Sequence, residues 1–215
     1  MKILKVFFNY ILVALVISIP AAIPAMFKNN TIAFYTATIV TICISFSYVY
    51  FENKNYKFGL FYLEGFKNKK IILYGMIILL VNQFIFIVLS ANGIVAERSR
   101  SDLYAEFSGN AFLLYTYFIV IGPIVEEVFF RGIFYKILLS KQEMLNAQNN
   151  IFNRKTMFTI LVNMILFSFL HKPEGLAWIF FLVGPFVLSI SYLKTDNLKV
   201  PICLHIFNNL VAALL

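Results

Sequence analysis

Apolar residues occur in long runs along the whole chain, and short polar segments separate these runs. A helix that crosses the hydrocarbon core of a bilayer needs about 20 mainly apolar residues. Seven runs have or approach this length, and they cover residues 3–27, 31–51, 71–91, 111–139, 157–170, 175–193 and 200–215. The pattern therefore predicts an all-α fold, a polytopic membrane helix bundle of about seven spans.

Several of these runs contain residues that break or kink helices. Pro20 and Pro24 should kink the outer end of the first run, because proline lacks a backbone donor and clashes with the preceding turn. Gly184-Pro185 interrupts the sixth run, and the last three runs are short or interrupted. The C-terminal half is therefore expected to contain irregular spans.

Composition supports a membrane environment. Hydrophobic residues make up 61% of the chain and charged residues 13%, against about 45–50% and about 25% in soluble domains. So few polar side chains cannot cover the surface of a water-soluble fold. The net charge of +8 comes from short basic runs between apolar stretches, which indicates topology signals and contacts with lipid headgroups. The expected partner is the lipid bilayer, and no nucleic acid is expected.

The basic residues also predict an orientation. The segment 52–70 holds the densest basic cluster, which comprises Lys54, Lys57, Lys67, Lys69 and Lys70. The positive-inside rule places this segment in the cytoplasm, so the N-terminus should be cytoplasmic and the C-terminus outside. The expected location is the cell membrane, as a multi-pass protein. A composition rich in Lys, Asn and Ile favours a bacterium with an AT-rich genome.

Three charged residues stand in the middle of the fourth run: Glu126, Glu127 and Arg131. An ionisable side chain at membrane depth costs roughly 2.5–3.5 kcal/mol on insertion scales, which makes each one a functional candidate. Glu127 and Arg131 are four residues apart and can pair on one helix face. Glu126 lies about 100° away and stays unpaired, so we assign it as a general base toward water. The alternative is a buried charge cluster that holds helices together.

The two histidines and one asparagine add to this set. His171 follows Phe167 by four residues, and His205 precedes Asn209 by four, so each pair shares a helix face. An imidazole and a carboxamide can both donate hydrogen bonds to a developing oxyanion. The histidines can also bind a metal with Glu126, as a three-ligand site open to water. A zinc site formed by Glu126, His171 and His205 is therefore a second possibility.

These residues fall into three ordered motifs. Glu126-Glu127-Val-Phe-Phe-Arg131 resembles the E-E-x-x-x-R motif of the CAAX protease and bacteriocin-processing family, also called the Abi family. Phe167-Ser-Phe-Leu-His171 is similar to its F-x-x-x-H motif, and His205-Ile-Phe-Asn-Asn209 to its H-x-x-x-N motif. The resemblance covers residues 111–215, which would form the protease core. Residues 1–110 would form N-terminal spans and loops.

The resemblance implies an α-helical intramembrane endopeptidase that acts on peptide bonds near the membrane surface. Glu126 would activate water together with His171, and Glu127 with Arg131 would support it. His205 and Asn209 would stabilise the oxyanion. Family members are often described as metalloproteases, whereas a metal-independent glutamate mechanism is also discussed, and the chain has no H-E-x-x-H zinc motif. Both mechanisms stay open.

The expected substrates are peptides or proteins near the membrane surface, such as bacteriocin or pheromone precursors, with self-immunity as one role. Processing of prenylated C-termini is the family's eukaryotic role and suits this chain less well. Two other classes remain. A non-catalytic scaffold or modulator of a sensor or export protein would retain the fold, and a transporter would use the carboxylates as a proton relay.

One geometric conflict follows from the predicted spans. If runs five, six and seven each cross the membrane fully, runs five and seven point in the same direction. His171 then lies near the outer end of its helix and His205 near the inner end of its own. A shared site requires a short or re-entrant sixth run, or helix boundaries other than those predicted.

Overall fold

A computed structural model describes residues 4–13, 15, 31–58, 60, 68–95 and 116–214. Every regular element in these ranges is a helix, which confirms the predicted all-α class. A short apolar helix, Leu4–Val13, comes first. The labelled helices are α2 (Thr31–Tyr56), α3 (Lys69–Ala91), η1 (Thr116–Ile121), α6 (Gly122–Glu127), η2 (Val128–Ile133), α7 (Phe134–Leu138), α8 (Lys141–Asn149), α9 (Arg154–His171), α10 (Ala177–Thr195) and α11 (Lys199–Leu214).

Three of these helices are long and apolar enough to cross a bilayer, namely α2, α3 and α10. Lys199–Leu214 is apolar but shorter. The predicted number of seven spans is therefore not confirmed, although six of the predicted runs match helices within a few residues. Pro20 and Pro24, with the predicted kink, lie outside the described residues.

The exposed side chains of α3 indicate that the protein is surrounded by lipid. Its described side chains are buried only at Gly75 and Leu79, whereas large apolar residues such as Tyr74 and Phe84 are 61% and 64% exposed. Soluble monomers rarely expose so many large apolar side chains along one helix. Lipid is the solvent that such a surface requires, so the chain is a multi-pass membrane protein.

The fourth run forms one continuous rod from η1 to α7. Its two π-helical stretches, η1 and η2, flank the short α6. Pro123 stands in the first turn of α6, directly after η1. Wide π turns are uncommon and often occur at functional sites. Here they flank Glu126 and Glu127, and Arg131 lies inside η2.

Helix α8 was not predicted. Ser140 accepts a hydrogen bond from the Glu143 backbone N–H, and the Glu143 carboxylate accepts one from the Ser140 N–H. This reciprocal capping box is visible in the sequence as Ser140-Lys-Gln-Glu143. Lys155 Nζ, at the start of α9, lies 2.7 Å from Glu143 Oε1. The ion pair with Lys155, ahead of the Ser140 hydrogen bonds, lowers the pKa of Glu143 to about 2.

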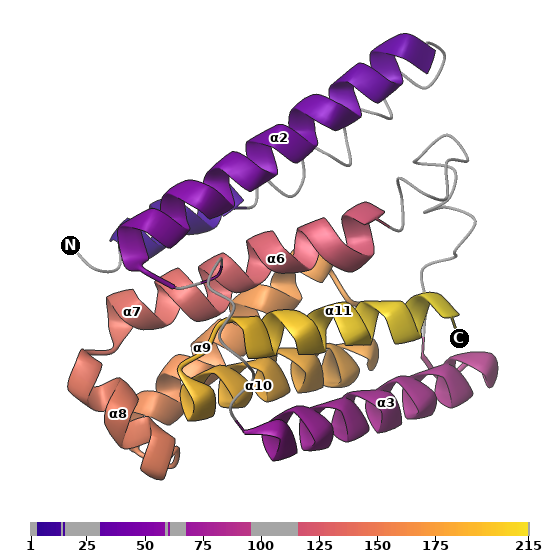
Figure 1. The fold of residues 1–215 in the computed structure, drawn as a ribbon. Coiled ribbons are helices and arrows are strands. Elements are labelled where there is room, and N and C mark those ends of the chain that lie inside the picture. Colours follow the sequence, from indigo (N-terminus) through magenta and orange to yellow (C-terminus); the bar gives the residue numbers. More distant parts are fainter. Residues whose placement is uncertain are drawn as a thin grey trace.

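The helices pack around the rod formed by α6 and its neighbours. In Figure 1, α11 lies between this rod and α3, and it contacts both α6 and α3. Helix α10 packs against α3, α9 and α11. Helix α2 lies on the other side of the rod, where it contacts α6 and η2. Helices α10 and α11 thus lie on one side of the rod and α2 on the other.

Candidate active site

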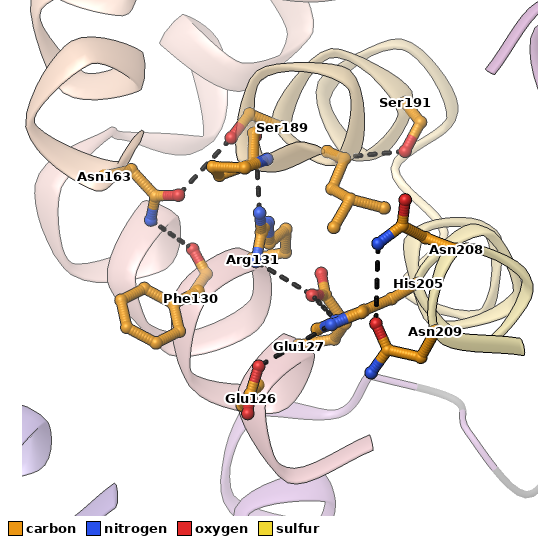
Figure 2. A network of polar contacts seen from close by, with 12 residues as sticks. Glu126, Glu127, Phe130, Arg131, Asn163, Ser189, Ser191, His205, Asn208 and Asn209 are labelled. Carbon is orange, nitrogen blue, oxygen red and sulfur yellow. Dashed lines mark hydrogen bonds and ion pairs between the residues drawn. The ribbon is translucent and has the colours of Figure 1, made fainter. Parts of the chain in front are cut away.

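Glu127 contacts both Arg131 and His205 in a buried cluster of charged side chains. Its Oε1 atom accepts a 2.8 Å hydrogen bond from Arg131 Nη1, and the same oxygen lies 2.8 Å from His205 Nδ1. Glu127 and Arg131 are fully buried, and His205 is 4% exposed. Figure 2 shows the three side chains converging from the rod and α11. The predicted Glu127–Arg131 pair is confirmed, and the bond to His205 is an addition to it.

Arg131 is held on several sides. Its second terminal nitrogen, Nη2, donates to the carbonyl of Pro185 in α10 at 3.3 Å. The guanidinium carbon lies 4.7 Å from the centre of the Phe167 ring in α9, within the range of a cation–π contact. Arg131 thus joins the rod to both neighbouring helices. A planar guanidinium suits this role because it has several donors in a rigid arrangement.

Glu126 points toward the other side of the same imidazole. Its Oε2 atom lies 3.7 Å from His205 Nε2, and Glu126 is 7% exposed. Among the described atoms Oε2 has no hydrogen-bond partner. The prediction that Glu126 stays outside the Glu127–Arg131 pair is therefore confirmed. The histidine directly beside Glu126 is His205, whereas the resemblance had paired Glu126 with His171.

The two carboxylates give His205 a defined chemistry. Glu127 accepts only, so the proton of His205 belongs on Nδ1, where it donates to Glu127 Oε1. In the neutral ring Nε2 is then a hydrogen-bond acceptor directed at the space beside Glu126. Donation to an oxyanion from Nε2 requires the doubly protonated imidazolium. A carboxylate that fixes the tautomer of a reactive histidine is a recurring arrangement in enzyme sites.

His171 is the last residue of α9 and is exposed at the surface of the described chain. Its ring packs between Phe167 and Phe181, with centroid distances of 5.0 Å and 5.7 Å. Phe167 also contacts the His205 ring at 5.6 Å. The two imidazoles therefore share one aromatic neighbour.

This proximity has a simple origin. Val200 and Leu204 of α11 pack against Val187 and Leu188, which lie in the C-terminal half of α10. His205 is the seventh residue of the 16-residue α11, so it lies near the middle of that helix rather than at its inner end. The sixth run is neither short nor interrupted, because α10 continues as one helix through Pro185.

Asn209 is one turn beyond His205 and is half-buried. Its Nδ2 atom donates a 2.9 Å hydrogen bond to the carbonyl of Phe118 in η1. Asn208 Nδ2 in turn lies 3.4 Å from Asn209 Oδ1. One N–H of the Asn209 amide is thus committed to the rod, and the second N–H is left for another acceptor.

Sequence reasoning missed a buried polar pair behind the charges. Asn163 Nδ2 donates to the carbonyl of Phe130 at 2.6 Å, and Ser189 Oγ lies 3.3 Å from Asn163 Oδ1. Both side chains are fully buried. They support the backbone next to Arg131 (Figure 2). Their signal in the sequence is an amide and a hydroxyl within otherwise apolar runs, which alone does not separate them from lone packing residues.

The fit to a metal ion is limited. The described residues contain no group of three His, Cys, Asp or Glu side chains arranged to hold one. Of the three expected ligands, Glu126 and His205 are adjacent, and Glu127 holds His205 through Nδ1, as carboxylates often hold histidines that bind metals. His171 is not gathered with them into a ligand set. Zinc binding by these residues stays a prediction.

Comparison with protein families identifies this region. Residues 108–211 match the family model described as Type II CAAX prenyl endopeptidase Rce1-like. This region is similar to the Rce1-like family. The match confirms the resemblance to CAAX proteases, and it contains all six predicted site residues. No curated protein and no solved structure matches the chain.

The Rce1-like assignment implies an intramembrane peptidase of the CAAX type. The family region covers the rod and α8 to α10 and most of α11. Helix α3 lies outside it, yet packs against α10 and α11. The Rce1-like site is therefore built next to a helix that the family match does not include.

Proposed function

We propose that this protein is an intramembrane endopeptidase that hydrolyses membrane-proximal peptide bonds with a water molecule activated by Glu126. One observation carries this proposal: Glu126 Oε2 lies 3.7 Å from His205 Nε2 and has no hydrogen-bond partner among the described atoms. A buried carboxylate with an unused lone pair beside an imidazole acceptor can bind water and take its proton.

The neighbouring residues support this role without reacting themselves. Glu127 holds His205 through Nδ1, so that Nε2 faces Glu126. Arg131 neutralises Glu127 and ties it to the Pro185 carbonyl. Without Arg131, the Glu127 charge would be buried next to the Glu126 charge, which is strongly unfavourable.

The proposed reaction has two proton transfers. Glu126 takes one proton from water while the water oxygen attacks the carbonyl carbon of the scissile peptide bond. The tetrahedral intermediate carries a negative oxygen, for which the second N–H of Asn209 is a donor. The C–N bond then breaks as the protonated Glu126 gives its proton to the leaving amine. His171 assists Glu126 in holding the attacking water.

Substrate and topology belong to the same proposal. The site lies in apolar helices, so its substrates are peptides anchored in or near the membrane, such as bacteriocin or pheromone precursors. Self-immunity is one physiological role for such cleavage. The N-terminus is proposed to be cytoplasmic, because the basic segment 52–70 satisfies the positive-inside rule there.

The test compares cells that produce wild-type protein, Glu126→Gln or Glu174→Gln at matched levels. Glu174 is exposed before α10, outside the charge cluster, and serves as the control. New N-termini of membrane and secreted proteins are identified by mass spectrometry. We expect specific new N-termini with wild type and Glu174→Gln, and none with Glu126→Gln. Identical profiles for wild type and Glu126→Gln would refute the proposal and favour a non-catalytic scaffold.

A further inference from the structure

Helix α3 carries two amide side chains at membrane depth, Asn82 and Gln83, within a helix that is otherwise strongly apolar. Both reach helices of the active-site region. Asn82 Nδ2 donates to the carbonyl of Phe180 in α10 at 3.3 Å. Gln83 Nε2 donates to Asn208 Oδ1 in α11 at 3.1 Å. Amides in apolar spans are costly unless they are paired, so both contacts require an explanation.

The Gln83 contact continues as a chain of amides. Asn208 Nδ2 lies 3.4 Å from Asn209 Oδ1, and Asn209 Nδ2 donates to the Phe118 carbonyl at 2.9 Å. The relay therefore runs from α3 through two adjacent residues of α11 to η1. Figure 2 shows the Asn208–Asn209 link beside His205.

The final acceptor fixes the direction of this relay. A backbone carbonyl can only accept, so Asn209 must turn its NH2 group toward Phe118 and its oxygen toward Asn208. Asn208 must then present its NH2 group to Asn209 and its oxygen to Gln83. Gln83 is thereby the donor at the start of the relay.

The relay ends on the rod, because Phe118 lies in η1. The position of the Asn209 amide is thus coupled to the rod that also carries Glu126.

A second contact sets the distance between α3 and α11. A Cβ atom at Gly75 would lie 2.8 Å from Leu204 Cδ1, so this glycine admits the Leu204 side chain against the α3 backbone. Leu204 is fully buried and directly precedes His205. Gly75 therefore controls how closely α11 approaches, while Gln83 controls how its amides are oriented.

We propose that Gln83 is a positioning residue of the active site: through Asn208 it orients the Asn209 carboxamide so that one N–H binds Phe118 and the other is available to the reacting carbonyl oxygen. This inference rests on the oxyanion role proposed for Asn209. It also extends the functional unit beyond the region matched by the family to include α3.

The test uses Gln83→Met, which keeps the length of the side chain and removes the donor. The matched control is Asn82→Leu, which removes the neighbouring amide and its bond to α10 but not the relay. In micelles, selective ¹⁵N-asparagine labelling reports the side-chain NH2 groups, and loss of a signal in Asn209→Ala identifies Asn209. We expect the Asn209 signal to shift or broaden in Gln83→Met and to stay in place in Asn82→Leu. An unchanged Asn209 signal in Gln83→Met overturns the proposal.

Cleavage supplies the second readout, at the sites identified by comparison with Glu126→Gln. We expect Gln83→Met to lower cleavage at least fivefold in the wild-type background and to cause no further loss in Asn209→Ala. Additive losses, or wild-type cleavage by a folded Gln83→Met, overturn the proposal. If Glu126-dependent cleavage is absent altogether, the proposed function fails, and the NMR comparison alone decides whether Gln83 orients Asn209.

Discussion

The hydroxyl of Ser168 donates a 2.8 Å hydrogen bond to the carbonyl of Phe181. Phe181 lies four residues before Pro185, so in a regular helix its carbonyl would bind the N–H that proline lacks. A neighbouring helix thus supplies the donor that the helix itself cannot, as transmembrane helices with internal prolines require. The carbonyl of Pro185 in turn binds Arg131, so this kink-prone position is tied to the charge cluster.

Ser168→Ala should lower the free energy of unfolding by about 1–3 kcal/mol, because it leaves the Phe181 carbonyl without a donor. Pro185→Ala restores the backbone N–H at that position. In the Pro185→Ala background the Phe181 carbonyl has a donor in its own helix. Ser168→Ala should therefore lower the free energy of unfolding less in this background than in the wild-type protein. SDS titration in micelles followed by circular dichroism measures all four proteins. If Ser168→Ala lowers the free energy of unfolding equally in both backgrounds, the Ser168 hydroxyl does not replace the N–H that Pro185 lacks.

The adjacent glutamates should respond differently to the same isosteric change. Glu127→Gln removes a charge bonded to both Arg131 and His205, and breaking a buried pair costs about 3–5 kcal/mol. Glu126→Gln removes a carboxylate oxygen that has no hydrogen-bond partner among the described atoms. We expect Glu126→Gln to abolish cleavage. It should lower the free energy of unfolding by less than about 1 kcal/mol, as is usual for substitutions that break no buried interaction. The same SDS titration checks this, and similar large destabilisation by both changes would refute the assignment.

Gly75→Ala should destabilise the protein by about 1–3 kcal/mol relative to Gly184→Ala, because the added methyl group overpacks a filled contact with Leu204. Gly184 provides the control, since an added Cβ atom there meets no atom within 4 Å. Gly184→Ala should leave stability unchanged or raise it by at most about 1 kcal/mol, the difference in helix propensity. Leu204→Val should make Gly75→Ala less destabilising, because the smaller side chain leaves room for the added methyl group. If the loss of unfolding free energy is the same in the Leu204→Val background as in the wild-type protein, the steric conflict does not involve Leu204.

The carboxyl group of Glu143 should titrate at about pH 2, which ¹³C NMR of the labelled side chain can measure. The folded-state pKa is lowered, so the ion pair contributes to stability above the unfolded pKa of about 4.5. This contribution is lost as the pH falls from about 4.5 through about 2. Lys155→Met removes the largest cause and should raise the pKa of Glu143 toward its usual value. A pKa that stays near 2 in Lys155→Met would assign the shift to the Ser140 cap instead.

The proposed orientation is testable with single cysteines after Cys43 and Cys203 are replaced by alanine. Asn92 and Lys141 are both exposed, and the positive-inside rule places them on opposite sides of the membrane. A membrane-impermeant maleimide should label Asn92→Cys in intact cells, and Lys141→Cys only after permeabilisation. The reverse pattern would invert the topology.

The motifs predicted the candidate site residues without any geometry, since Glu127 with Arg131 and His205 with Asn209 stand at i,i+4 spacings that any helix preserves. Apolar run lengths likewise predicted the helices, because burial in lipid requires continuous apolar sequence. The i,i+4 pairs and the lengths of the apolar runs depend only on local sequence periodicity and on the surrounding solvent. They can therefore be predicted from one sequence.

Contacts between helices could not be read in this way. Which imidazole meets Glu126 depends on the offset between α9 and α11, which the packing of Leu204 and its neighbours against α10 sets. The roles of Ser168 and Gln83 depend on carbonyls and amides far away in sequence. The sequence by itself determined the membrane environment and the helices, and it predicted the candidate site residues. The tertiary structure alone decided which of these groups face one another, because that depends on how helices distant in the chain pack.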